Sequence, residues 1–158
     1  TDFSLEGARA GIPWLGTSVA SLGDLRRVVV IGSNLRKDHP LIAARLRVAA
    51  RKGQKLGLVG AYFADPLIPL TADVRVAPSA LPQVLAEAVV GLASRKGVTP
   101  EADVAPLLNG VTATDRVAAL VDLLAADGDG GVFLGNEAQH HGAYAAVERL
   151  ARALASLS

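Results

Sequence analysis

The chain has 158 residues, of which 51% are apolar and 20% are charged. Its 16 lysines and arginines are balanced by 15 acidic residues, so the composition gives no sign of general binding to the phosphate backbone of nucleic acids. The absence of cysteine excludes disulfides, zinc–thiolate sites, thiol nucleophiles and iron–sulfur ligation from this sequence.

The first 24 residues contain four glycines and one proline and show no sustained hydrophobic period. They are predicted to form an irregular N-terminal segment, in which Trp14 beside Pro13 is a packing anchor. The remaining residues, 25–158, have a length that suits a single domain. Because the sequence contains no methionine, we expect a piece of a longer chain or one whose natural start has been removed.

The first regular element is a strand over residues 25–31, which includes an unbroken β-branched run from Val28 to Ile31. Such a run is typical of a strand that is buried on both faces, as in parallel sheets. A turn at residues 32–34 leads to a helix over residues 40–52, with Pro40 in the first turn. A second strand over residues 55–59 completes a β–α–β unit.

The second half of the chain repeats this alternation of strands and helices. We expect a short strand at residues 74–76, a helix from residue 80 to 96, an exposed connector over 98–111, a helix after a capping box formed by Thr112 and Asp115, a strand at 132–134 and a last helix over 142–157. The order predicts an α/β fold with a doubly wound, mostly parallel sheet flanked by helices, which is a Rossmann-like domain. The apolar runs are too short to span a bilayer, so we expect no direct membrane insertion.

A cluster of cations lies on and around the first predicted helix. A solvated helix face explains it more simply than a nucleic-acid site, and we expect no nucleic-acid partner. The cluster consists of Arg36, Lys37, Arg45, Arg47, Arg51 and Lys52.

Gly32 and Asn34 are the candidate cofactor-binding residues, because ligands of open α/β sheets bind at the carboxyl ends of strands. Backbone donors of the following helix could hold a phosphate there. A tight strand-to-helix turn alone would explain Gly32 and is the favoured interpretation, since neither a G-x-G-x-x-G nor a Walker A pattern is present. Strand two is followed by no acid before Asp65, which argues against a bound dinucleotide.

The histidines give no catalytic or metal site. His140 and His141 have only Glu137 as a nearby carboxylate, so a capping or interface role is favoured over metal binding. Asp38 and His39 imitate an acid/base pair but lack an accompanying nucleophile. We therefore expect no catalytic and no metal-binding residues.

Residues 27–47 read Arg-Val-Val-Val-Ile, Gly-Ser-Asn and Leu-Arg-Lys-Asp-His-Pro in their first part. This stretch resembles the molybdopterin-oxidoreductase family, in which a strand ends in Gly-Ser-Asn and a helix starts near His-Pro. Its fuller form resembles the G subunit of bacterial NADH–quinone oxidoreductase, the large iron–sulfur subunit of respiratory complex I. The same resemblance extends to residues 1–4, 12–16, 77–81, 133–136 and 139–141.

The resemblance implies that iron–sulfur clusters lie elsewhere in the full subunit and that this part has no cofactor. Relatives that bind molybdopterin guanine dinucleotide place a Gly-x-Asn turn, here Gly32 and Asn34, against the nucleotide. They also carry Asp-Pro-Arg after strand two and a Pro-Gly-Thr-Asp turn before the next helix. This sequence has Gly-Ala-Tyr at 60–62 and Ala-Pro-Ser-Ala at 77–80 instead. A vestigial site is therefore implied.

The resulting hypothesis is a structural or interaction domain of the large iron–sulfur subunit. Its partners would be other subunits of the complex I peripheral arm, on the cytoplasmic side of the bacterial inner membrane. One alternative is a molybdopterin-guanine-dinucleotide-binding domain of a molybdenum oxidoreductase such as a formate dehydrogenase. Another is a freestanding nucleotide-binding domain.

Overall fold

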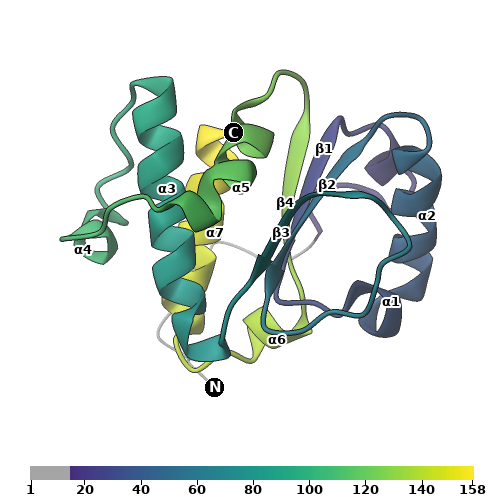
Figure 1. The fold of residues 1–158 in the computed structure, drawn as a ribbon, viewed down its shortest axis with the longest axis horizontal. Helices are drawn as coiled ribbons and strands as arrows, with labels where there is room; N and C mark the ends of the chain where they lie inside the picture. Colours follow the sequence, from purple (N-terminus) through teal and green to yellow (C-terminus); the bar gives the residue numbers. More distant parts are fainter. Residues whose placement is uncertain (1–14) are drawn as a thin grey trace.

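A parallel sheet runs through the centre of the molecule, with helices packed on both of its faces (Figure 1). The computed structural model describes residues 15–158. The spatial order of the strands is β3-β2-β1-β4, and all three neighbouring pairs are parallel, as the sequence predicts. The strands are β1 (Arg27–Ile31), β2 (Lys55–Gly60), β3 (Leu70–Arg75) and β4 (Gly130–Leu134).

Helices separate the strands along the described part of the chain, except that a loop joins β2 to β3. Short 3-10 turns lie at Ser21–Gly23, Pro78–Ala80 and Asp115–Val117. The α-helices are α1 (Leu35–Asp38), α2 (Pro40–Ala50), α3 (Leu81–Lys96), α4 (Ala105–Leu108), α5 (Ala118–Ala125), α6 (Asn136–Gln139) and α7 (Tyr144–Leu157). The protein is thus a doubly wound α/β domain.

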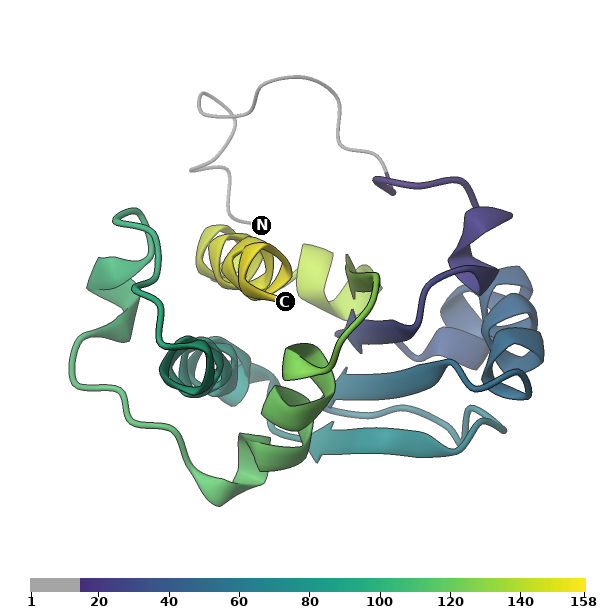
Figure 2. The same cartoon turned by 90° about the horizontal axis from the view of Figure 1, so that it is seen from above.

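Strand β1 occupies the middle of the sheet because its side chains are apolar on both faces. All five of its residues are buried, and the four apolar ones alternate between two cores. Val29 and Ile31 face the core under α3, α5 and α7, whereas Val28 and Val30 face the core under α1 and α2. Figure 2 shows the blue α2 on one side of the sheet, with the teal α3, green α5 and yellow α7 on the other.

The larger core is built by helices with one apolar stripe each. In the helices predicted over residues 80–96 and 142–157, apolar residues recur at helical spacing, and in α3 and α7 the residues of these stripes are buried. These residues are Leu81, Val84, Leu85, Val89 and Leu92 in α3, and Val147, Leu150, Ala151 and Leu154 in α7.

A buried carboxylate ties α3 to the segment before α5. Glu87 is 3% exposed, and its carboxylate receives the Nε–H of Arg116 at 2.8 Å and a second guanidinium N–H of the same residue. The hydroxyl of Thr114 donates to it at 2.6 Å and the amide of Gln83 at 3.2 Å. The Arg116 guanidinium is the main cause that lowers the pKa of Glu87 to about 2.

Three local predictions from the sequence are wrong. The third strand starts at Leu70, four residues before the expected Val74, because Leu70–Arg75 alternate exposed and buried side chains and pair with β2. The capping box at Thr112 does not form, since a 3-10 turn from Asp115 precedes α5 without a side-chain cap. The connector before it is not wholly exposed, because Val104 is buried in the larger core.

Part of the N-terminal prediction lies outside the described residues. Pro13 and Trp14, as well as the resemblance at residues 1–4 and 12–14, belong to that part. Residues 15–24 are irregular apart from the turn at Ser21–Gly23, in agreement with the prediction for this stretch. Among residues 15–158, no helix combines the length and apolar character needed to cross a membrane.

Candidate functional site

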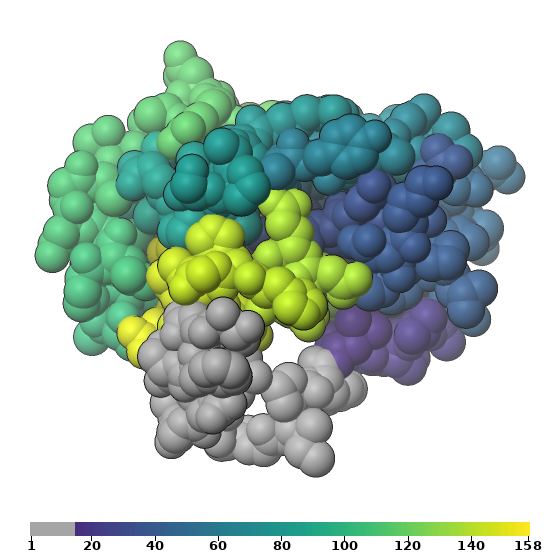
Figure 3. Space-filling view, turned by 90° about the horizontal axis from the view of Figure 1, so that it is seen from below, coloured from purple at the N-terminus to yellow at the C-terminus, as the bar shows by residue number. Residues whose placement is uncertain are grey.

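The candidate site lies at the carboxyl end of β1, where the chain changes direction across the sheet. From β1 the chain runs to β2 and β3 on one side, and it returns to place β4 on the other side of β1. Ligands of doubly wound folds bind in the crevice at such a switch point. Figure 3 views this end of the molecule and shows the yellow-green α6 between the blue of α1 and the teal segments around β3.

Gly32 directly follows β1 and touches α6 rather than an open crevice. Its φ of +62° is a left-handed conformation that favours glycine. A Cβ at this position would lie 2.5 Å from the backbone nitrogen of Ala138. The carbonyl oxygen of Gly32 also accepts the backbone N–H of Glu137 at 2.9 Å. The close approach that Gly32 permits is therefore used by the protein's own helix.

Gly135 makes the matching contact from β4. Its N–H donates to the carbonyl of Ile31 at 2.8 Å, which extends the pairing of β4 with β1. A Cβ on Gly135 would lie 2.2 Å from the Cβ of Ser33, a distance that no side chain tolerates. The turn after β1 and the start of α6 thus depend on a glycine on each side.

Asn34 uses its polar groups within the fold. Its Oδ1 accepts the backbone N–H of Ala64 at 3.2 Å, which fastens the loop between β2 and β3. Its own backbone N–H donates to the carboxylate of Asp38 at 2.8 Å, and the Ser33 hydroxyl donates to the same oxygen at 3.1 Å. The Asp38 carboxylate therefore stabilises the turn before α1. These hydrogen bonds explain its position without an acid/base pair with His39.

Glu137 brings to the end of β2 the acid that the sequence of this strand lacks. Its Oε1 accepts the backbone N–H of Ala61 at 3.3 Å, and its other carboxylate oxygen would lie 3.4 Å from a Cβ on Gly60. From the sequence alone, Glu137 is only a carboxylate near the two histidines. One feature of the sequence points to Glu137. It follows Gly135, which ends a strand, by two residues, and this position faces the ends of the other strands.

The two histidines lie on the far side of α6 and point to different partners. Nδ1 of His141 accepts the backbone N–H of Ala143 at 3.0 Å, so Nε2 carries the proton that is donated to the Pro78 carbonyl at 2.8 Å. Nδ1 of His140 lies 2.8 Å from the carbonyl of Asn136. His141 thus joins the start of α7 to the turn before α3.

The chemistry available at this end of the sheet is limited by these contacts. Gly32, Asn34 and Glu137, the groups that a nucleotide would use, are all engaged by backbone groups of the chain itself. Within residues 15–158, no three His, Asp or Glu side chains gather in a way that suits a metal ion. The geometry favours a structural junction between β1, β2 and β4.

Comparisons with known proteins leave the family open. No protein-family model matches this chain, and no curated protein is significantly similar to it. The resemblance carried by residues 27–47 consequently remains the basis of a proposal.

Proposed function

We propose that the protein is a structural and interaction domain of the large iron–sulfur (G) subunit of a bacterial NADH–quinone oxidoreductase. In this role it has neither a cofactor nor catalytic residues, and it contacts other subunits of the peripheral arm on the cytoplasmic side of the inner membrane. The iron–sulfur clusters would belong to cysteine-containing parts of the full subunit. The residues behind this proposal are those of 27–47, which form β1, the turn after it and the helices α1 and α2.

The observation that carries the proposal is the position of α6 in the switch-point crevice. Ala138 is fully buried against Gly32, and the N–H groups of Glu137 and Ala138 point to the Gly32 carbonyl at 2.9 and 3.3 Å. A nucleotide phosphate that approached the backbone of Gly32 would first have to displace this helix. A domain whose ligand crevice is filled by its own chain is better suited to contact other proteins than to hold a cofactor.

A molybdopterin-guanine-dinucleotide-binding domain is the second candidate. It is favoured by the location of Gly32 and Asn34 at the carboxyl end of β1, beside the switch point. The engagement of Asn34 with Ala64 and of Glu137 with Ala61 weighs against it.

Nucleotide titration tests the cofactor-free part of the proposal. We expect isothermal titration of the 158-residue protein with GDP, GTP or NADH to give no measurable heat of binding. A Glu137→Ala variant, which removes the carboxylate but leaves α6 in place, should also fail to bind, because Ala138 still covers Gly32. A dissociation constant in the low micromolar range, about −8 kcal/mol, for the unmodified protein would contradict the proposal and support the second candidate.

The role in the parent complex is tested in the full subunit. We expect deletion of this domain to prevent or weaken assembly of the peripheral arm, because partner contacts are lost. We expect Asn34→Ala to assemble and to retain NADH–quinone turnover per assembled complex, because Asn34 holds only the β2–β3 loop. Normal assembly of Asn34→Ala with abolished turnover would instead place a functional site at the end of β1.

A further inference from the structure

The outer face of α2 combines an apolar stripe with positive charge. Of the large apolar side chains that are exposed among residues 15–158, three lie together here: Leu41 is 79% exposed, Val48 55% and Val19 40%. Leu41 and Val48 are seven residues apart and therefore share one side of the helix. Elsewhere, α2 buries Ala43 and Leu46 in the core against the sheet, so this helix is apolar on two opposite faces.

These side chains border a groove between α2 and the segment that precedes β1. Its volume is about 590 Å³. Small residues from both segments line it and allow close approach of another backbone. The lining residues are Val19, Ala20, Gly23, Asp24, Leu41, Ala44, Arg45, Val48, Ala49 and Lys52.

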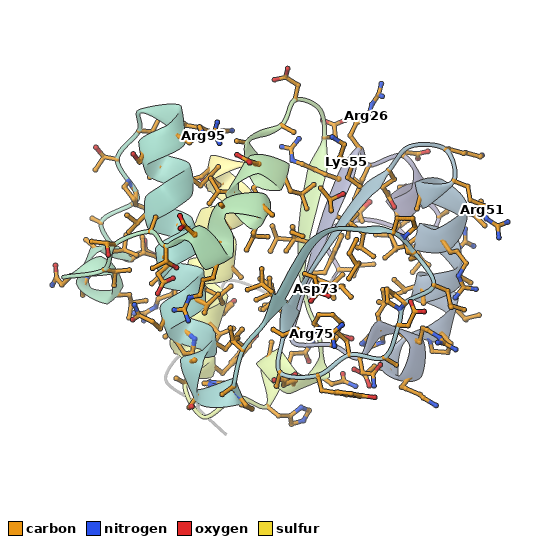
Figure 4. All side chains as sticks on the ribbon, viewed as in Figure 1. Arg26, Arg51, Lys55, Asp73, Arg75 and Arg95 are labelled. Atoms are coloured by element: carbon orange, nitrogen blue, oxygen red, sulfur yellow. The ribbon has the colours of Figure 1, made fainter. Side chains whose placement is uncertain are left out.

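Cations surround the groove without acidic partners in the described part of the chain. Arg45 and Lys52 line it directly, and the exposed Arg51 points outward from α2 (Figure 4). The ion pairs found among residues 15–158 involve none of these three. Among the described residues of the lining, Asp24 is the one acid beside Arg45 and Lys52, so this lining carries a net positive charge.

We propose that this groove binds an acidic amphipathic helix of a partner protein. A row of leucine-like side chains would fill the space beside Leu41 and Val48, and flanking glutamates or aspartates would face Arg45 and Lys52. A second copy of this chain is a poor occupant, because the cations of both copies would face each other. Nucleic acid is also disfavoured, because the lining residues that the structure describes include no aromatic ring on which a base could stack.

This inference rests on the proposed role as an interaction domain, but it does not depend on the identity of the parent complex. A solvated helix face, the interpretation that the sequence favours for the cationic cluster, accounts for only part of this surface. Arg36, Lys37, Arg45, Arg51 and Lys52 are indeed exposed. The exposed apolar residues Leu41 and Val48 on the same face make it amphipathic, which the charges alone do not reveal.

Binding of a peptide to the fluorophore-labelled protein gives the direct test. The probe is a synthetic helix of about 18 residues with leucines on one stripe and glutamates on both flanks. The chain has no native cysteine, so Val48→Cys can carry an environment-sensitive fluorophore, and Val98→Cys, exposed in the connector, serves as the matched position. We expect the peptide to change the emission at position 48 but not at 98, with a dissociation constant of about 10–100 µM at low salt.

Variants then separate the apolar from the electrostatic contribution to peptide binding. Fluorescence anisotropy of the labelled peptide should show at least about tenfold weaker binding to Leu41→Ser/Val48→Ser and to Arg45→Glu/Lys52→Glu, a loss of about 1.4 kcal/mol. Val98→Ser and Lys96→Glu, which change exposed residues outside the groove lining, should bind as the parent protein does. Circular dichroism checks that all four variants fold, which is expected because every substituted side chain is exposed.

Several results would overturn the inference. They are the absence of binding at about 1 mM peptide, equal binding of a peptide with lysines in place of glutamates, and binding that the groove substitutions leave unchanged. Binding of a DNA duplex that is lost in Arg45→Glu/Lys52→Glu but kept in Leu41→Ser/Val48→Ser would favour nucleic acid instead. If deletion of the domain blocks assembly of the complex while the groove variants neither bind the peptide less nor assemble less, the inference fails and the proposed function stands.

Discussion

The two sides of the sheet differ in how completely they are buried. Among the described residues, 24 buried apolar side chains form the core under α3, α5 and α7, whereas 10 form the core under α1 and α2. The larger side is also held by the ion pair of the buried Glu87 with Arg116, and the smaller side by hydrogen bonds of Asn34 and Asp38 at a loop and a turn. The comparison indicates that the three-helix layer supplies most of the stability and that the α2 layer is the more adaptable one.

Core truncations on the two sides should give the largest effects. Leu85→Ala in α3 and Leu46→Ala in α2 remove the same atoms from side chains that are at most 1% exposed. Each is expected to lower the free energy of unfolding by about 2–5 kcal/mol, with Leu85→Ala at the upper end because its surroundings are packed on all sides. Urea denaturation at neutral pH measures both. A larger cost for Leu46→Ala would reverse the comparison.

The Glu87–Arg116 ion pair should make the stability of the three-helix layer sensitive to acid. The pKa of Glu87 is lowered from 4.5 to about 2 in the folded protein. The stabilisation is therefore complete above pH 4.5 and is lost as the pH falls toward 2, because the unfolded chain binds a proton first.

A Glu87→Gln variant removes this dependence. We expect it to be about 1–3 kcal/mol less stable at pH 7, a range that allows for solvent screening of the half-exposed Arg116. Its disadvantage relative to the parent protein should shrink as the pH is lowered from 4.5 to 2.5. Thermal unfolding across this range measures the difference, and a constant difference would show that the pair does not control acid stability.

The α2 side should respond less to loss of a polar contact. Asn34→Ala removes the acceptor of the Ala64 N–H and is expected to cost about 1 kcal/mol. Hydrogen exchange should show faster opening of the loop at residues 61–69, with no change in α3 or α7. A cost as large as that of Leu85→Ala would mean that Asn34 supports far more of the fold than this loop.

An exposed ion pair provides the lower limit of the series. Arg95 at the end of α3 bonds to Asp122 in α5, and both side chains are more than half exposed. Asp122→Asn should change the stability by no more than about 0.5 kcal/mol at physiological salt. A measurable loss in the same urea experiments would show that the contact between α3 and α5 relies on this pair.

Long periodic elements could be predicted from the sequence, and short or non-local ones could not. The β-branched run in β1 and the stripes of α3 and α7 each follow from local spacing. Helices α1 and α6 have only four residues each, which is too few for a hydrophobic period, so both were missed. The consequence is largest at the candidate site, since α6 fills the crevice beside Gly32.

The buried carboxylate was also missed, although the sequence contains a sign of it. Glu87 is the only charged residue between positions 81 and 94, and it lies among residues predicted to face the core. A lone charge in such a setting needs a partner. Its partner Arg116 is 29 residues away in a segment without regular period, so the pairing itself depended on the tertiary structure.

The junction of Gly32 with Ala138 and of Gly135 with Ser33 affects how relatives of this protein should be compared. Any side chain at either glycine would collide with the neighbouring segment, so both positions should be invariant across an alignment of homologues. Purifying selection for folding alone would produce that invariance, in lineages that bind a nucleotide and in lineages that do not. Conservation of the Gly-x-Asn turn is therefore a poor marker of cofactor binding, and variation at Ala138 and Glu137 would be the informative signal.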